Sequence, residues 1–457
     1  MSDADSAASA RADAPLIEYD IDDEPPLSEA IPLGIQHLLA MFLSTVALPL
    51  VIAGAIGLEP AETTFIVQMA LLVAGIATIV QVYSIGPVGA RLPIVMGTSA
   101  IFVAPLIDIG TTFGLAAIFG AVIVAAPLEI VIGYFYDDLR RFFPPLVTGT
   151  VVMLVGLTLI PVAIDYSAGG PGAPTYGNFE NLALAGLVFA VAIGLNQYFD
   201  GLLSISSVLI AVVLGYLVAV PLGLLDLSGV GNAGWIAIPM PLEYGVEFHP
   251  SAILIAAFAY VVTSIETIGD VEGTTGTVGR RATTEEMRGG LYADGFMSMF
   301  AGLFNAFPNT SFSQNVGLIG FTGVASKFVV GICGVFLVVL GLIPKVAALV
   351  AAMPNPVLGG AAVVLFGMIF SIGLRIVSES VDLNRRNLTI VAVSVVLGVG
   401  VEVRPAALEQ LPGDLQVLVG SGLLVGGVTA LVLNAILPRE GGDRQGVTQV
   451  EDTERTS

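Results

Sequence analysis

The sequence predicts an all-α polytopic membrane protein with fourteen transmembrane segments, arranged as two inverted halves of seven. Of its 457 residues, 55% are hydrophobic and only 12% are charged, whereas a soluble protein carries roughly 25% charged residues. The apolar runs approach about 20 residues, which is the length of a membrane-crossing helix rather than of a barrel strand. In addition, a pattern of prolines and glycines in the first half of the chain recurs in the second half.

The apolar runs are separated by short polar loops, and the third and tenth runs are short and interrupted. They cover residues 33–54, 64–84, 92–107, 111–134, 145–163, 181–198, 203–223, 251–270, 289–305, 310–323, 328–350, 356–374, 388–403 and 414–437. We therefore expect fourteen spans, which places both termini on the same side of the membrane.

The basic residues predict which side that is, because cytoplasmic loops are enriched in Lys and Arg. If the N-terminus is cytoplasmic, only Lys345 and Arg404 fall in outer loops. The residues that then fall on the cytoplasmic side are Arg91, Arg140, Arg141, Arg280, Arg281, Arg288, Lys327, Arg375, Arg385, Arg386 and Arg439. We expect a multi-pass protein of the cell membrane with cytoplasmic N- and C-termini.

Much of the net charge of −21 lies at the two ends of the chain. Residues 1–30 hold nine acidic residues against Arg11. We predict that 1–30 and 438–457 are disordered, solvated cytoplasmic tails. The acidity, together with only two lysines among sixteen basic residues, resembles the composition of halophile proteins, in particular those of haloarchaea. An acidic N-terminus does not resemble a secretory signal.

The internal repeat predicts how the two halves are related. A proline followed by glycines four and eleven positions later occurs at 145–156 and again at 356–367, an offset of 211 residues. At an offset of 215, Pro93 in the third run corresponds to Pro308 before the tenth. Because each half has seven spans, the second half is inverted in the membrane. Inverted repeats with paired broken helices indicate alternating-access transport, with the solute site at the midplane.

The most informative stretch is 305–323, which is too polar and too broken for an ordinary span. Pro308 interrupts helical hydrogen bonding, residues 310–313 are small or β-prone, and a helix is expected to resume from Asn315. Irregular backbone at membrane depth persists only where protein buries it or it lines a cavity. The new helix start would also offer free N–H groups to a ligand. We therefore predict that this stretch forms half of a solute-binding site.

Two carboxylates near the end of the eighth run are candidates for the chemistry of that site. Glu266 and Asp270 are four residues apart and so share one helix face. An ionisable residue at a helix centre costs about 2.5–3.5 kcal/mol on insertion scales, so it is a functional candidate. Glu266 is expected to accept hydrogen bonds from the N–H groups of a planar solute, and either acid could carry a proton. The alternative for Asp270 is a helix cap or a place at the membrane interface.

Two further buried titratable residues are candidates for ion coupling. Asp294 is the only acid of the ninth run, and either a proton or cation relay or a structural bond to backbone would explain it. His37 lies inside the first run, where a coupling role and a structural role are both open. Glu129 precedes the aromatic and charged loop at 134–143, so we expect it near the cytoplasmic surface and assign it no role.

Three residues at the helix restart can contact a solute directly. The amides of Gln314 and Asn315 both donate and accept, which suits a solute edge that carries both kinds of group. Their alternative role is to bond the backbone freed by the break. Phe312 could stack on a planar ring or simply fill space.

Several other function classes find no support in the sequence. The single cysteine, Cys333, excludes a disulfide or a cysteine metal cluster, and two histidines make a histidine-rich metal site unexpected. The zinc-protease, nucleophile-elbow and phosphate-loop motifs are absent from the sequence. We expect neither an enzyme nor a resident cofactor, and no nucleic-acid partner.

Residues 314–323, Gln-Asn-Val-Gly-Leu-Ile-Gly-Phe-Thr-Gly, resemble the signature of the nucleobase–ascorbate transporter family, also called nucleobase:cation symporter family 2. That signature is Gln or Glu, Asn, any residue, Gly, four residues of any kind, Thr, then a basic residue or Gly. Other motifs of the family are also matched: Gln36-His37, Glu266-Thr-Ile-Gly-Asp270, Asp294 twenty residues before Gln314, and Arg386-Asn387. The resemblance covers about residues 31–437.

The resemblance implies two domains, each built from both halves of the chain. The core domain would comprise 31–134 (spans 1–4) and 250–350 (spans 8–11). The gate domain would comprise 135–224 (spans 5–7) and 351–437 (spans 12–14), and it would mediate a homodimer. The third and tenth spans would contain short extended segments that pair, with the substrate between them.

The resemblance also implies roles for individual residues. Those expected to bind substrate are Glu266, Gln314, Ala100, Ser313, Phe312 and Ser99, with the backbone N–H groups near Ala100 and Ser313 completing the contacts. Those expected to support the site or tune proton coupling are Asp270, Asp294, His37 and Asn315.

Substrate choice rests mainly on position 314. Gln314 together with Asp270 resembles the xanthine and uric acid permease branch, whereas uracil-type members begin the signature with Glu and often carry His in place of Asp270. We therefore expect proton-coupled import of xanthine or uric acid, with sodium as the alternative coupling ion. The alternative functions are a uracil permease and, on a related architecture, a sulfate- or bicarbonate-type anion transporter. The carboxylate of Glu266 disfavours the anion transporter because it would repel an anion.

Overall fold

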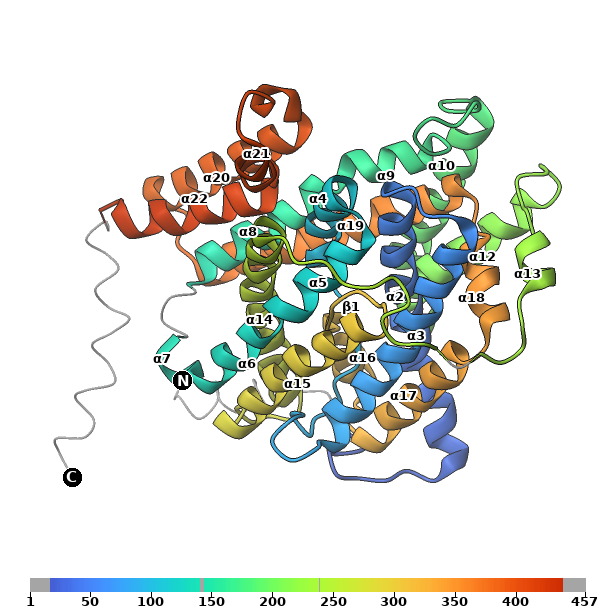
Figure 1. The fold of residues 1–457 in the computed structure, drawn as a ribbon. Coiled ribbons are helices and arrows are strands. Elements are labelled where there is room, and N and C mark those ends of the chain that lie inside the picture. Colours follow the sequence, from blue (N-terminus) through green and yellow to red (C-terminus); the bar gives the residue numbers. More distant parts are fainter. Residues whose placement is uncertain (1–16, 140–143, 238, 439–457) are drawn as a thin grey trace.

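A computed structural model describes residues 17–139, 144–237 and 239–438, and within these ranges the chain is built almost entirely of helices (Figure 1). The predicted tail residues 1–16 and 439–457 lie outside the described residues, as do Arg140, Arg141 and Arg439 of the charge count. Eight described helices are long and apolar enough to cross a membrane, or nine if the bent pair α17–α18 counts as one span.

The first half of the chain contains seven segments at the predicted places. They are α2 (Leu27–Ala55); α3 (Pro60–Tyr83); β1 (Met96–Thr98), η1 (Ala100–Phe102) and α4 (Val103–Phe113); α5 (Leu115–Ala125) and α6 (Pro127–Tyr134); α8 (Pro145–Thr158) and α9 (Ile160–Ser167); α10 (Phe179–Tyr198); and α11 (Leu202–Ile205) with α12 (Ser207–Ala219). The short helices α7 (Tyr136–Leu139) and α13 (Ser228–Asn232) lie in the connections.

The second half repeats the arrangement. Its segments are α14 (Pro250–Thr277); α15 (Thr284–Leu303); β2 (Asn309–Ser311) and α16 (Ser313–Thr322); α17 (Lys327–Gly341) and α18 (Pro344–Ala351); α19 (Asn355–Ser380); α20 (Arg385–Val403); and α21 (Gly413–Gly420) with α22 (Gly422–Ile436), η3 (Pro405–Leu408) lying in a loop. The prediction of two inverted halves with seven segments each is confirmed. One interrupted segment lies at the same place in each half.

The two interruptions meet in space. β1 and β2 pair as an antiparallel two-stranded sheet, with Met96 opposite Ser311 and Thr98 opposite Asn309. The extended chain is continued on both sides, because Ser99 N–H donates to the Pro308 carbonyl (2.9 Å) and Phe312 N–H donates to the Val95 carbonyl (3.0 Å). A pair of strands this short satisfies the backbone groups that a broken helix leaves free inside the membrane.

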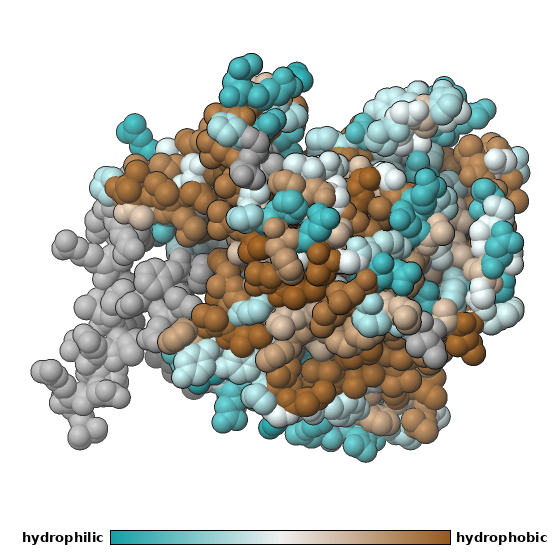
Figure 2. All heavy atoms as spheres, in the orientation of Figure 1, coloured by the Kyte–Doolittle hydropathy of each residue, from teal (hydrophilic) through white to brown (hydrophobic). Residues whose placement is uncertain are grey.

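Helix packing defines two sets of elements that are used below. In the core set (α2 to α6 and α14 to α18, with both strands), α3 packs on α17 and α15 packs on α6. In the gate set (α8 to α12 and α19 to α22), α8 packs on α19 and α20 packs on α22. Figure 1 shows β1 near the centre of the molecule, with α14 and α2 to either side. Figure 2 shows hydrophobic residues across the middle of the visible face and hydrophilic residues mostly toward its upper and lower ends, as expected of a multi-pass membrane protein.

Two helix boundaries differ from the expected ones. α14 continues to Thr277, so Asp270 lies within the helix, and the alternative that it caps the helix end is wrong. α16 begins at Ser313 rather than at Asn315, because Phe312 is the last extended residue. The helix start therefore lies directly beside the paired strands.

The predicted disorder of 1–30 is wrong for the part that the structure describes. Residues 18–21 lie alongside the loop between α16 and α17: Glu18 N–H donates to the Gly323 carbonyl (2.9 Å), and Ala325 N–H donates to the Tyr19 carbonyl (2.8 Å). The Ile21 side chain is buried in an apolar cluster. The backbone hydrogen bonds and the buried Ile21 side chain order this segment despite its acidic composition. They attach residues 18–21 to the C-terminal end of α16.

Candidate functional site

A cavity of about 520 Å³ lies between the core set and the gate set, beside the paired strands. Its polar lining comes mainly from the core set: Ser44, Thr98, Glu266, Asp270, Thr277, Thr310, Ser311, Ser313 and Gln314, with Thr148 and Arg375 from the gate set. Its apolar wall on the opposite side comes mainly from α8 and α19: Val152, Leu365, Ile369, Ile372 and Ile376. Such a mixture of a few convergent polar groups and an apolar wall is typical of small-molecule sites.

Two helix starts converge on this cavity from the two halves of the chain. η1 begins at Ala100, directly after β1, and α16 begins at Ser313, directly after β2. Ala100 and Ser313 both line the cavity. The first N–H groups of a helix have no intrahelical acceptor and carry partial positive charge. They are thus available, from both sides of the cavity, to donate hydrogen bonds to a ligand oxygen or ring nitrogen.

Glu266 and Gln314 face the same cavity from different elements. Glu266 lies on α14, and Gln314 lies in the first turn of α16. The carboxylate offers acceptors only, whereas the amide offers both a donor and an acceptor. Together they can recognise a ligand that has N–H groups on one edge and a mixture of donors and acceptors on another.

Asp270 braces the strand and the helix start. One of its carboxylate oxygens accepts a hydrogen bond from Ser311 Oγ (2.5 Å), and the other accepts one from Ser313 Oγ (2.6 Å). With both oxygens engaged, Asp270 holds β2 and α16 against α14. The Ser313 hydroxyl is therefore committed to Asp270, and its backbone N–H is the group left for a ligand.

Asp294 lies one layer behind the cavity. Its side chain is fully buried, and one oxygen accepts hydrogen bonds from the Thr267 hydroxyl and from Thr310 Oγ1 (3.4 Å for the latter). Thr310 is the central residue of β2 and lines the cavity. Asp294 thus contacts the ligand-facing strand without being among the residues that line the cavity.

His37 and Asn315 form a buried pair that fixes α16 to α2. The Asn315 side-chain nitrogen lies 3.0 Å from His37 Nδ1 and donates to the His37 carbonyl (3.1 Å). Because an amide N–H can only donate, Nδ1 accepts and the ring proton is assigned to Nε2. Neither residue is among those lining the cavity, so both support the helix start from behind.

Phe312 and Ser99 occupy different environments. Phe312 lines the cavity, and its ring lies over Gly97 of β1, where an added Cβ would come within 2.4 Å of Phe312 Cε2. Ser99 is fully buried, its N–H bonds Pro308, and it is not among the lining residues. Of the neighbouring candidates Ser99 and Ala100, only Ala100 reaches the cavity.

The sequence-based expectation for Glu129 is wrong. Its side chain is fully buried and accepts a hydrogen bond from Thr263 Oγ1 at 2.5 Å. The position of Glu129 inside the apolar run 111–134 is the sequence feature that indicates its burial. The sequence also does not single out several polar lining residues, among them Thr98, Thr310 and the gate-set residue Arg375. Thr98 and Thr310 lie on the paired strands, so only their pairing register could have placed them.

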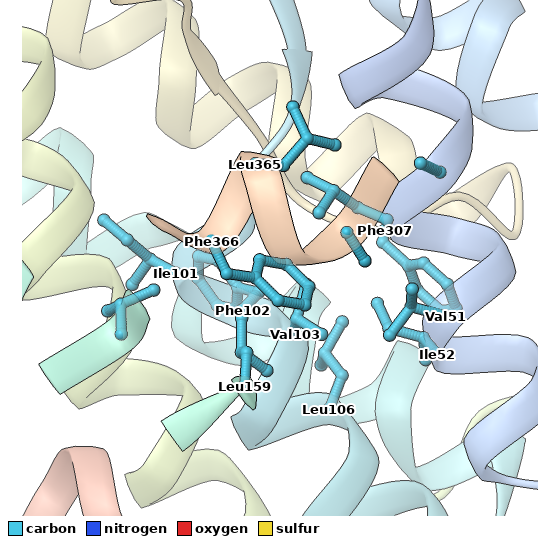
Figure 3. Close-up of a cluster of buried hydrophobic side chains, with 14 of the residues drawn as sticks. Val51, Ile52, Ile101, Phe102, Val103, Leu106, Leu159, Phe307, Leu365 and Phe366 are labelled. Carbon is cyan, nitrogen blue, oxygen red and sulfur yellow. The ribbon is translucent and has the colours of Figure 1, made fainter. Parts of the chain in front are cut away.

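The cavity is bounded differently at its two ends. At one end it reaches Thr277, Arg375 and Gly320, near the ends of α14, α19 and α16. At the other end, core-set and gate-set side chains pack into one apolar cluster that includes Phe102, Leu106, Leu159 and Phe366 (Figure 3).

A polar contact between the two sets reinforces this closed end. Tyr166 of α9 donates its hydroxyl hydrogen bond to the Val51 carbonyl (3.1 Å). The approach is possible because Gly54 has no Cβ, since a Cβ there would lie 1.9 Å from the Tyr166 oxygen. The core and gate sets are thus in contact on one side of the cavity.

A model described as that of a permease family matches residues 28–407 of this chain. The protein belongs to this permease family. The expected membership of the nucleobase–ascorbate transporters is confirmed, and the permease is not an enzyme.

Relatives of this permease match over most of their length. A putative purine permease of Clostridium perfringens is 42% identical over 92% of this chain and 92% of its own. The xanthine permease of Escherichia coli is 40% identical, covering 92% and 95%, and that of Bacillus subtilis is 37% identical, covering 89% and 93%.

Solved structures share the fold of this permease at low sequence identity. The transmembrane domain of a cyanobacterial bicarbonate transporter has a TM-score of 0.58 at 13% identity, covering 91% of this chain and all of that one. A murine solute carrier 26 family member A9 anion transporter has a TM-score of 0.61 at 13% identity, covering 94% and 72%. These similarities confirm the inverted-repeat architecture.

Proposed function

We propose that this permease imports an oxidised purine, xanthine or uric acid, together with protons. The observation that carries the proposal is that Glu266 and Gln314 face one cavity between two helix starts. Relatives of 37–42% identity are named xanthine permease, uric acid permease or putative purine permease, which supports a nucleobase as substrate.

The chemistry of the cavity favours an oxidised purine over the alternatives. Uracil can present N–H groups to two carboxylates, whereas an oxidised purine has a mixed edge that suits the Gln314 amide. Phe312 lies beside the cavity, where its ring can pack against a flat heterocycle. A sulfate-type anion would meet the Glu266 carboxylate, and like charges repel.

Proton coupling is supported by buried carboxyls that have no cationic partner. None of the ion pairs found among the described residues involves the buried Asp270 or Asp294. A buried charge without a partner is costly, so such groups bind a proton instead. His37 and Asn315 tune this coupling indirectly, by holding α16 in place.

The shape of the cavity supports a direction of opening. It reaches Arg375, which belongs to the basic residues assigned to the cytoplasmic side. The structure would then be inward-facing, with both termini cytoplasmic. The gate set would form the homodimer contact, and its helices α10 and α20 are largely unburied within one chain, which leaves them free to meet lipid or a second copy.

A competition assay tests the substrate. In proteoliposomes containing the purified protein, uptake of labelled xanthine is expected to fall in the presence of excess unlabelled xanthine or uric acid and to persist with excess uracil or sulfate. Strong competition by uracil together with none by xanthine would contradict the proposal. In a second arm, an imposed pH gradient is expected to drive uptake, and uptake driven only by a sodium gradient at fixed pH would reject proton coupling.

A further inference from the structure

Glu129 is a fully buried carboxyl group on α6 that lies outside the cavity. Its Oε1 accepts the hydrogen bond from Thr263 of α14, and its Oε2 is buried without a hydrogen-bond partner. α6 packs on both α14 and α15, so the carboxyl is enclosed within the core set. Nothing in the transport site described above uses this group.

The titratable groups whose charge acts on Glu129 are acidic or neutral. They are Tyr260 and Glu266 from α14 and Asp294 from α15. Arg288, the basic residue on α15, forms its ion pair with Asp137. Asp294 also has one buried oxygen without a hydrogen-bond partner. Within the described residues, Glu129 and Asp294 thus form a carboxyl pair without an ion-paired base.

Such a pair must hold at least one proton. Moving an isolated carboxylate into a low-dielectric interior costs on the order of tens of kcal/mol by Born solvation, and real groups bind a proton instead. Two carboxylates in one site add mutual repulsion, so the second negative charge costs more than the first. The unpartnered oxygens of Glu129 and Asp294 are the places available for the proton.

A polar face of α14 connects Glu129 with the substrate strand. Thr263 and Thr267 are one helical turn apart on the same face of α14. Thr263 contacts Glu129, and Thr267 donates to Asp294, which also contacts Thr310 of β2. Glu129 and the strand that lines the cavity thus both contact threonines along one face of α14, the strand through Asp294.

We propose that Glu129 is a second proton-binding residue of the transport cycle, which exchanges one proton with Asp294. When Asp294 is ionised, Glu129 holds the proton on its carboxyl group. In the exchange, the O–H bond of Glu129 breaks as one forms on Asp294, so the pair keeps a single negative charge throughout. Net transport starts with both carboxyls protonated. Asp294 releases its proton, Glu129 then passes its own proton to Asp294, and a proton taken up before the next turnover restores the O–H bond of Glu129. The inference rests on the proposed proton coupling.

The test compares two transport modes in proteoliposomes, using labelled xanthine and three variants. Exchange of internal for external xanthine at equal pH needs no net release of protons, whereas uptake driven by an imposed pH gradient does. We expect Glu129→Gln to keep exchange within about twofold of wild type and to lose gradient-driven uptake by at least about tenfold, the equivalent of one pH unit. Glu129→Asp keeps a titratable carboxyl at this position and is expected to retain uptake driven by the pH gradient. Glu272→Gln, at an exposed position of α14, is the matched control and should behave as wild type.

Each other outcome overturns the inference for a different reason. If Glu129→Gln takes up xanthine under a pH gradient as fast as wild type, this carboxyl carries no transported proton. Loss of both modes in both Glu129 variants would assign it to folding alone. If wild-type protein itself fails to respond to a pH gradient, the proposed proton coupling is wrong, and the wild-type arm reveals this separately from the variants.

Discussion

Replacing Glu266 by Gln is expected to abolish nucleobase uptake, because the cavity then loses the one carboxylate whose oxygens are free to accept from the substrate. Asp270 is less available than Glu266, since each of its oxygens already accepts one hydrogen bond, from Ser311 and from Ser313. A hydrogen bond to a charged group contributes about 1.5–3 kcal/mol, and the Gln NH₂ would in addition face substrate donors. We expect a loss of at least about fiftyfold in xanthine uptake.

The measurement is initial uptake of labelled xanthine at several concentrations, together with thermal unfolding of the purified variant. Glu272→Gln makes the same chemical change on the same helix at an exposed position and should leave uptake unchanged. Uptake by Glu266→Gln within a few-fold of wild type, from a folded protein, would remove Glu266 from the substrate site. It would also reopen the anion-transporter alternative.

Replacing Gly97 by Ala is expected to disrupt the substrate site through packing alone. An added Cβ would lie 2.4 Å from Phe312 Cε2 and 2.5 Å from Thr45 Oγ1, both on buried side chains. Overpacking of this kind costs about 1–3 kcal/mol. Because the backbone of Gly97 is paired with Thr310, the strain is relieved either by moving Phe312 into the cavity or by separating the two strands.

We expect Gly97→Ala to weaken xanthine binding at least about tenfold, the equivalent of about 1.4 kcal/mol. The binding constant can be measured by calorimetry on purified protein. Gly400→Ala on α20 is the matched control, because a Cβ there meets nothing within 4 Å. Equal binding by the two variants would show that close contact between Phe312 and β1 is not needed.

The architecture can be predicted because it depends mainly on local features of the sequence. Length and hydropathy determined the spans, and Pro93 and Pro308 marked the two interruptions in corresponding places. Once the halves are inverted, the two breaks must face one another at the midplane, and the pairing of Gly97 with Thr310 follows that expectation.

Much of the candidate site could not be predicted, because it depends on contacts between elements far apart in the chain. That both oxygens of Asp270 accept hydrogen bonds, and that Ser99 is turned away from the cavity, follow from the strand register. The sequence predicts the wrong environment for Glu129 because a loop rich in aromatic and charged residues follows it, whereas its burial depends on α14 and α15. The segment at 18–21 was misjudged because backbone pairing with residues 323 and 325 leaves no signature in composition.

The most direct test of the account is a structure determined with xanthine bound. The account predicts that the purine lies between the starts of η1 and α16, with one edge on the Glu266 carboxylate and another on the Gln314 amide, and with Phe312 beside the ring. A purine bound elsewhere in the protein, or one that touches neither Glu266 nor Gln314, would contradict it.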